Sequence, residues 1–184
     1  MKNKASGFSL LELIVTLLII AILSSIAAPA FSNFMNRQSV EAQTYNVWRL
    51  LNTTRELAIN SGKQISICGL NSNNQCDRSD IKKLVVYEDM NKNKTFDADE
   101  AVAHEININP KNKVLMRVSG RARTLTYNST GYARQFGGII VCSMSDEDVI
   151  EKITVNRAGR IYKSPDRDGD GRVEKATGEE IVCE

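Results

Sequence analysis

Two short acidic segments hold the residues best suited to bind a metal ion. Each places Asp, Asn or Glu at alternate positions, as EF-hand-type calcium loops do, because a hard cation needs several oxygen ligands from one tight turn. The candidate ligands are Asp89, Asn91, Asn93, Asp97 and Glu100 in the first segment and Asp166, Asp168, Asp170 and Glu174 in the second. Each loop lacks one part, since Lys94 stands at position six, usually glycine, and Thr177 at position twelve, usually glutamate. Calcium is the one cofactor that the sequence suggests, and a solvated turn without any cofactor is the alternative.

The first 31 residues have the character of a membrane segment. Residues 1–7 are polar and carry Lys2 and Lys4, whereas residues 13–30 contain no charge. A helix over residues 8–31 would rise about 36 Å, which is enough to cross a bilayer core of roughly 30 Å. Lysines before the span place the N-terminus in the cytoplasm and the body of the protein outside. Glu12 would cost roughly 2.5–3.5 kcal/mol inside a membrane, so we expect it to have a function and a partner.

Four cysteines lie in the exported part, and an even number outside the cytoplasm favours disulfides. Three pairings are open. We prefer Cys68–Cys76, which closes a short loop, and Cys142–Cys183, which ties the C-terminus to a strand. A zinc site is the weaker interpretation, because the spacings are wide and the single histidine, His104, has no C-x-x-C nearby. The sequence also lacks the common nucleophile and phosphate-binding motifs, so we expect no enzyme.

The elements that position these residues are one long helix and a series of short strands. Apolar or near-apolar residues recur at helical spacing beyond the membrane segment, at Val40, Thr44, Val47, Leu51, Thr54 and Ala58. Residues 32–62 therefore form an amphipathic continuation of the helix, and we expect Trp48 to pack in the core. Strands are predicted at 64–68, 84–88, 105–109, 114–118, 124–127, 138–141, 152–155 and 160–162. The fold class is α+β, with a long N-terminal helix packed on antiparallel β-sheet within one β-rich domain, 63–184, and two disulfides.

The segment Gly7-Phe8-Ser9-Leu10-Leu11-Glu12-Leu13-Ile14 resembles the type III signal of type IV pilins and type II secretion pseudopilins. The resemblance implies that residues 1–7 are a leader, which a prepilin peptidase removes between Gly7 and Phe8 before it methylates the Phe8 amine. It also implies that residues 8–31 form the transmembrane and filament-core half of the helix. Glu12 would meet the N-terminal ammonium of a neighbouring subunit, which makes both buried charges tolerable. Pro29 falls where this family carries a helix-loosening proline.

Further stretches resemble the GspH/FimT/FimU group of minor pilins and pseudopilins, at residues 86–100, 125–131, 137–142 and 153–160. The resemblance implies a minor subunit that helps initiate or cap assembly of a type IV pilus, which serves adhesion, twitching motility and DNA uptake. Its partners would be other pilins or pseudopilins and the prepilin peptidase. It would cross the inner membrane once, with a periplasmic C-terminal domain, and later reach the cell surface. A minor pseudopilin of a type II secretion system is an alternative, because it shares the N-terminal signal.

A second alternative is a DNA-binding minor pilin for natural transformation. FimT-type members of the group bind DNA through a Gly-Arg-x-Arg stretch, and here Gly159-Arg160-Ile161 is followed by Tyr162. Arg157, Arg160 and Lys163 could still contact phosphates, and Tyr162 could stack on a base. The net charge of +2 does not indicate whether the chain binds an acidic partner such as DNA. The charge is unevenly distributed, however, since residues 106–145 contain six basic residues and no acid. The alternative interpretation is that these residues form a charged cluster at a sheet edge and do not bind DNA.

Overall fold

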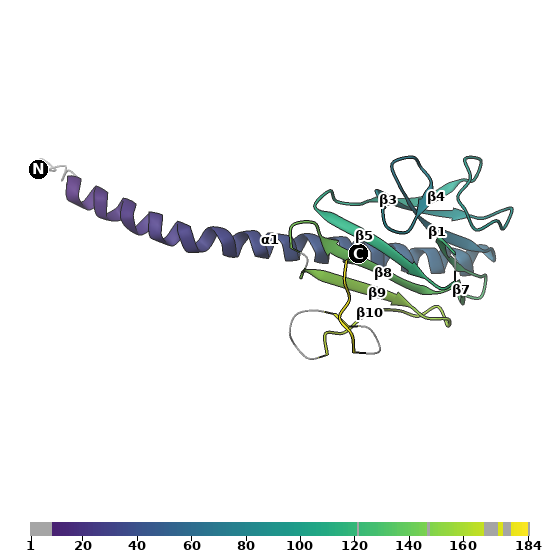
Figure 1. Cartoon of the computed structure of the whole chain (residues 1–184). Coiled ribbons are helices and arrows are strands. Elements are labelled where there is room, and N and C mark those ends of the chain that lie inside the picture. The colour runs from purple at the N-terminus through teal and green to yellow at the C-terminus, as the bar shows by residue number, and fades with distance from the viewer. Residues whose placement is uncertain (1–8, 121, 147, 168–172, 175–177, 184) are drawn as a thin grey trace, which may run out of the picture. The chain divides into compact units, whose positions relative to one another are not determined.

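The computed structural model describes residues 9–120, 122–146, 148–167, 173–174 and 178–183. In this part of the chain one helix precedes ten strands (Figure 1). The helix is α1 (Leu10–Ser61), and the strands are β1 (Ile65–Leu70), β2 (Cys76–Asp77), β3 (Lys83–Glu88), β4 (Val102–Asn107), β5 (Asn112–Val118), β6 (Thr124–Tyr127), β7 (Ala133–Gln135), β8 (Gly137–Ser143), β9 (Ile150–Val155) and β10 (Ile161–Lys163). Contacts divide the chain into two compact units, Met1–Met35 and Asn36–Glu184, and α1 contributes residues to both.

In the first unit, α1 begins directly after Ser9. The Ser9 hydroxyl accepts a hydrogen bond from the Glu12 backbone N–H at 3.2 Å, and the Ser9 carbonyl accepts one from the Leu13 N–H at 3.1 Å. Ser9 is therefore an N-cap, which satisfies donors that the first turn of a helix leaves open. The helix continues through Pro29 even though proline supplies no N–H.

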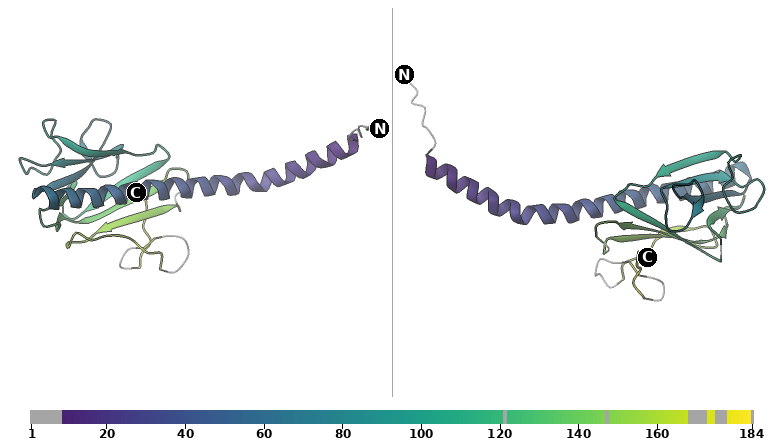
Figure 2. Two further views of the ribbon diagram at one scale, coloured as in Figure 1. Left: turned by 180° about the vertical axis from the view of Figure 1, so that it is seen from behind. Right: turned by 45° about the horizontal axis from the view of Figure 1, so that its top comes forward.

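The second unit contains two antiparallel sheets. Sheet A has six strands in the order β4-β3-β1-β6-β7, with β2 also paired to β1, and sheet B has four strands in the order β10-β9-β8-β5. In sheet A, β1 runs against β3 with Ile65 opposite Glu88 and Leu70 opposite Lys83. The two views in Figure 2 show both sheets lying along the second half of α1. The antiparallel α+β fold and the long helix are as predicted.

One core joins the helix to the inner faces of both sheets. From α1 it takes Val40, Val47 and Leu51, each with no exposed surface, together with Leu50 and Ala58. Sheet A adds residues such as Ile67 and Leu125, and sheet B adds residues such as Met116 and Ile153. This burial confirms the predicted stripe, since Thr44 and Thr54 are buried on the same side of α1. Trp48 does not belong to it: the side chain is 40% exposed and stacks on Tyr45. The expectation that Trp48 packs in the core was wrong.

The outer faces of the sheets are covered as well, and each cover includes a disulfide. Over sheet B, Val173 and Ile181 pack on Leu115 and Ile140, and Cys142 of β8 is bonded to Cys183 with the Cα atoms 6.3 Å apart. Over sheet A, Phe96 packs on Tyr87, and Cys68 of β1 is bonded to Cys76 with the Cα atoms 5.6 Å apart. These are the two pairings that we preferred. Burial on both faces explains why β1 is buried at every residue instead of alternating.

Two turns from different sheets meet at the end of the helix. The Arg55 side chain of α1 donates a hydrogen bond to the carbonyl of Gly131, in the β6–β7 turn, at 3.0 Å. Gly159, in the β9–β10 turn, lies against the same carbonyl, and a Cβ atom added there would be 1.9 Å from the Gly131 oxygen. Gly159 also has a φ of +76°, which favours glycine. The contact links α1, sheet A and sheet B at one point.

Candidate functional site

The apolar N-terminal half of α1 is the most unusual surface of the molecule. Every described residue from 9 to 35 is exposed in the isolated chain, including Leu10 at 77% and Ile26 at 68%. It belongs to α1, the one helix among the described residues that is long and apolar enough to cross a membrane. Contiguous apolar surface of this kind normally marks contact with a membrane or with other proteins. The segment is therefore a surface for partners outside the chain.

Glu12 is the one charged residue in this exposed apolar stretch before Arg37. It stands in the first turn of α1, three residues after the cap Ser9. Ser and Glu at this spacing form the sequence pattern of a capping box, and a carboxylate in the first turn interacts favourably with the positive end of the helix. The cap was not part of the sequence-based prediction, although the S-x-x-E pattern could have revealed it. Gly7 and Phe8, the predicted cleavage residues, lie outside the described residues.

The first acidic loop is organised by hydrogen bonds from its own backbone. The carboxylate of Asp89, a residue that is only 2% exposed, accepts from the N–H groups of Asn93 and Lys94 at 3.1 and 2.9 Å. The Glu100 carboxylate accepts from the N–H groups of Met90 and Asp97. Burial raises the pKa of Glu100, and the neighbouring carboxylates of Asp89 and Asp97 raise it further. Lys94 takes the left-handed conformation, with φ of +66°, that this position of an EF-hand-type loop requires.

The second acidic loop is described only at Asp166 and Glu174 of its candidate ligands, and Asp168 and Asp170 lie outside the described residues. The Glu174 carboxylate accepts from the Arg167 backbone N–H at 3.0 Å. In the described residues of the whole chain, no three His, Cys, Asp or Glu side chains are placed so that they could hold a metal ion. Calcium binding by either loop stays a prediction.

The four candidate DNA-binding residues are all exposed, and two of them already have partners. Arg157 lies over the Phe136 ring, with the guanidinium carbon 5.3 Å from the ring centre. The Lys163 ammonium is 2.6 Å from the Glu151 carboxylate, so its charge is already paired. Tyr162 and Lys163 are consecutive in β10, and consecutive strand residues point to opposite faces. Arg160 is exposed in the adjoining turn. DNA binding by these residues stays a prediction.

Comparison with known families identifies two parts of the sequence. Residues 2–28 match the prokaryotic N-terminal methylation motif. Residues 46–159, more than half of the chain, match the family of the type II transport protein GspH. The chain belongs to the GspH family. The comparison with curated protein sequences gave no match.

Solved structures with the same fold come from two kinds of filament. The minor pilin FimU of the Pseudomonas aeruginosa type IV pilus is 16% identical over 72% of this chain and 92% of its own, with a TM-score of 0.52. The minor pseudopilin EpsH of the Vibrio cholerae type 2 secretion system is 14% identical over 68% of this chain and 95% of its own, with a TM-score of 0.50. At these identities the likeness shows the fold alone. Together with the GspH match, it makes the chain a minor pilin or pseudopilin of the type IV pilus and type II secretion family.

Proposed function

We propose that this GspH-family chain is a minor pilin that helps initiate or cap assembly of a type IV pilus. In this proposal a prepilin peptidase cuts between Gly7 and Phe8 and methylates the Phe8 amine. The chain first spans the inner membrane, with its C-terminal domain in the periplasm, and then joins the pilus. The observation that supports the proposal is the exposed apolar half of α1, most of which lies within the matched methylation motif.

Glu12 is the residue that we assign to subunit recognition. After cleavage it would lie at position five of the mature chain, close to the new N-terminal ammonium of a neighbouring helix. A buried carboxylate and a buried ammonium are each costly alone and tolerable when paired. Such a pair would set the axial register between helices, and Pro29 would allow the helix to loosen during packing.

The test is incorporation into filaments by variants expressed in the native cell. We expect Glu12→Gln to be cleaved and anchored normally but to fall at least about tenfold in the sheared filament fraction, since a buried charge pair is lost. Glu56→Gln, an exposed residue of the second half of α1, is the matched control and should be incorporated like wild type. Equal incorporation of Glu12→Gln and wild type would contradict the assignment.

The choice between the two machines requires a second experiment, since a minor pseudopilin of a type II secretion system is the alternative. Affinity capture of the tagged chain from native membranes, followed by mass spectrometry, identifies its neighbours. We expect type IV pilins. Recovery of type II secretion pseudopilins instead would assign the chain to the secretion system.

DNA binding for natural transformation is the second candidate function. It is supported by Arg160, which is exposed, and by Tyr162, which is 47% exposed beside it. The pairing of Lys163 with Glu151 weakens it. Titration of the full chain in neutral detergent with double-stranded DNA at low salt tests it. Binding that neither falls with salt nor changes in Arg160→Ala would exclude these residues as the site.

A further inference from the structure

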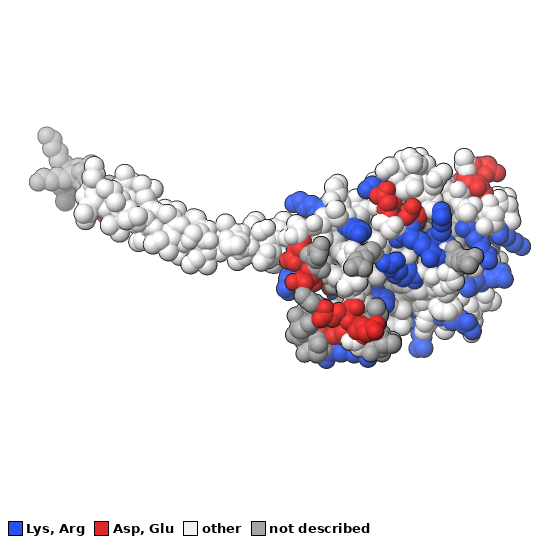
Figure 3. All heavy atoms as spheres, viewed as in Figure 1, with Lys and Arg blue, Asp and Glu red and all other residues white. Residues whose placement is uncertain are grey.

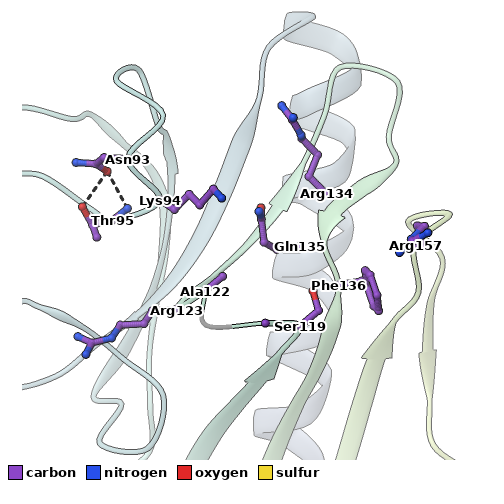
Figure 4. Close-up of a pocket in the computed structure, with 11 residues that line it drawn as sticks. Asn93, Lys94, Thr95, Ser119, Ala122, Arg123, Arg134, Gln135, Phe136 and Arg157 are labelled. Atoms are coloured by element: carbon purple, nitrogen blue, oxygen red, sulfur yellow. Dashed lines mark hydrogen bonds between the residues drawn. The ribbon is translucent and has the colours of Figure 1, made fainter.

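Among the described residues that line one pocket of the globular unit, four are basic and none is acidic. Lys94 comes from the first acidic loop, Arg123 from the β5–β6 turn, Arg134 from β7 and Arg157 from the β9–β10 turn. The pocket has a volume of about 710 Å³, and Figure 4 shows these segments, with the Arg123 side chain turned away from Gln135. An adjoining smaller pocket shares Lys94 and Arg134 and adds Lys92. Basic residues that are scattered over 64 positions of the sequence, from 94 to 157, thus form one site.

None of these four charges is neutralised within the described residues. Arg123 donates to the carbonyl of Cys76 at 3.2 Å, Arg134 donates to the side-chain oxygen of Gln64 at 3.1 Å, and Arg157 lies over Phe136. All three partners are neutral. No ion pair of the described part of the chain includes any of the four residues. Like charges gathered in one pocket repel each other, so an anionic ligand that enters would be favoured.

Lys94 shows how the pocket acquires one of its charges. Its φ of +66° is a conformation that glycine adopts at lower cost. The Asp89 carboxylate holds the Lys94 N–H inside the loop, while the Lys94 side chain extends out of the loop toward Gln135 and Arg134 (Figure 4). The cation therefore serves the pocket and does not cover the acidic loop. Figure 3 shows the wider pattern, in which basic and acidic side chains gather in separate patches on the globular unit.

The chemistry of the lining distinguishes between two kinds of polyanion. A single-stranded nucleic acid gains much of its affinity from bases stacked on aromatic rings. Phe136 is the one aromatic residue among those that line the pocket, and Arg157 already covers its face. Carboxylates, in contrast, fit the forked donors of arginine, and peptide groups can bond to the side chains of Ser119 and Gln135. Asn93 and Thr95 also line the pocket, but their side chains already hydrogen-bond to each other. The lining favours a peptide with acidic side chains.

We propose that this pocket binds an acidic peptide segment of a neighbouring filament subunit. The assignment of the peptide to a neighbouring subunit rests on the proposed function, because a filament subunit contacts other subunits along its length. The binding chemistry does not, because it can be measured on the chain alone. Complementary charge at such a contact would orient the two subunits and accelerate their encounter.

The experiment uses the full chain in neutral detergent and a fluorescent peptide with six consecutive glutamates, with a six-glutamine peptide for comparison. We expect only the glutamate peptide to bind and its affinity to fall as salt rises. Arg134→Gln should weaken binding by about tenfold, because one charge-assisted hydrogen bond is lost. Lys94→Gly should weaken it severalfold while the fold is kept, because glycine suits the conformation of this position. Lys111→Gln, an exposed change outside the pocket with the same loss of charge, should leave the affinity within about twofold of wild type.

Three results would overturn the proposal. The first is no binding of the glutamate peptide, and the second is binding that Arg134→Gln and Lys94→Gly leave unchanged. The third is tighter, Arg134-dependent binding of a mixed-sequence single-stranded oligonucleotide, which would make the pocket a nucleic-acid site. Filament incorporation of the same variants is measured separately. Failure of wild type to enter filaments would count against the proposed function, and a negative peptide titration would count against the pocket alone.

Discussion

The two halves of α1 place their apolar residues in opposite environments, and the first half carries nearly twice as many of them as the second. In the first unit Leu18 is 59% exposed, as are its apolar neighbours to a similar degree. In the second unit Val40, Val47 and Leu51 have no exposed surface. The second half is held by the sheets of its own chain, whereas the first half needs lipid or other subunits. Hydrophobic residues on one continuous helix thus encode stability in one region and assembly in the other.

The largest expected effect on the free energy of unfolding comes from the disulfide of the second unit that ties the C-terminus to β8. Cys142→Ala combined with Cys183→Ala should lower the free energy of unfolding by about 4 kcal/mol, because the bond closes a long loop. Cys68→Ala combined with Cys76→Ala should cost less, about 2.5 kcal/mol, because its loop is short. Urea unfolding of the full chain in detergent, followed by the fluorescence of Trp48, measures both. Equal losses would mean that packing, not loop length, sets the effect, and membrane anchoring should be unchanged in either variant.

A matched pair of leucines tests the comparison directly. Leu51→Ala should cost about 3 kcal/mol in the same unfolding experiment, since it leaves a cavity in the shared core. Leu18→Ala removes the same atoms from an exposed site, so it should change the free energy of unfolding by less than about 0.5 kcal/mol. A large loss from Leu18→Ala would show that the first half of α1 also supports the fold.

A smaller effect should depend on pH. The pKa of Asp77 lies at about 2, below its ordinary value of 3.8, because the backbone N–H groups of Ser79 and Asp80 donate to its carboxylate. The charged form is therefore favoured in the folded chain, and its stabilisation is complete above pH 3.8 and lost as the pH falls through about 2. Asp77→Ala should cost roughly 1 kcal/mol at pH 7, where solvent screens part of the effect, and almost nothing at pH 2. Asp77→Asn keeps an acceptor oxygen, so its cost at pH 7 should be smaller than that of Asp77→Ala, and it should also shrink toward pH 2, because the wild type loses the Asp77 charge there.

The smallest expected effect is that of calcium on the first acidic loop. If the loop binds calcium with a Kd near 1 mM, 1 mM calcium adds about 0.4 kcal/mol and raises Tm by one or two degrees. Asp89→Asn should abolish the rise, and magnesium should not reproduce it. The same Tm with and without calcium would mean that the loop depends on its internal hydrogen bonds alone.

Most of the architecture could be predicted from local sequence patterns. Helical spacing identified the buried stripe of α1, and runs rich in Ile, Val and Tyr identified eight of the strands, with β6 at the predicted bounds. The two missed strands, β2 and β7, are only two and three residues long and depend on pairing with neighbours. β4 begins at Val102, before the predicted start at residue 105, because its register follows β3.

The sites were predicted less well, because they depend on distant residues. The cysteine pairing followed from loop length and export, and Glu12 stood out as a charge in an apolar stretch. The basic pocket had only a partial local signal, since Arg123 and Arg134 belong to the acid-free stretch 106–145 but Lys94 and Arg157 come from separate turns outside it. Lys94 was interpreted only as a defect of a calcium loop, and its contribution to the pocket became visible in three dimensions. Trp48 shows the opposite error, because its spacing puts it beside the buried stripe, yet 40% of its side chain stays exposed.

The contact of Gly159 with the Gly131 carbonyl limits which sequences this fold can accept. A side chain at position 159 would have to occupy space that the other turn already fills, while Arg55 holds that turn in place. In a saturation library selected for folded protein, position 159 should accept glycine alone, and insertions should be rejected in both turns together. Length changes among relatives should therefore fall elsewhere, in loops that do not meet a second turn.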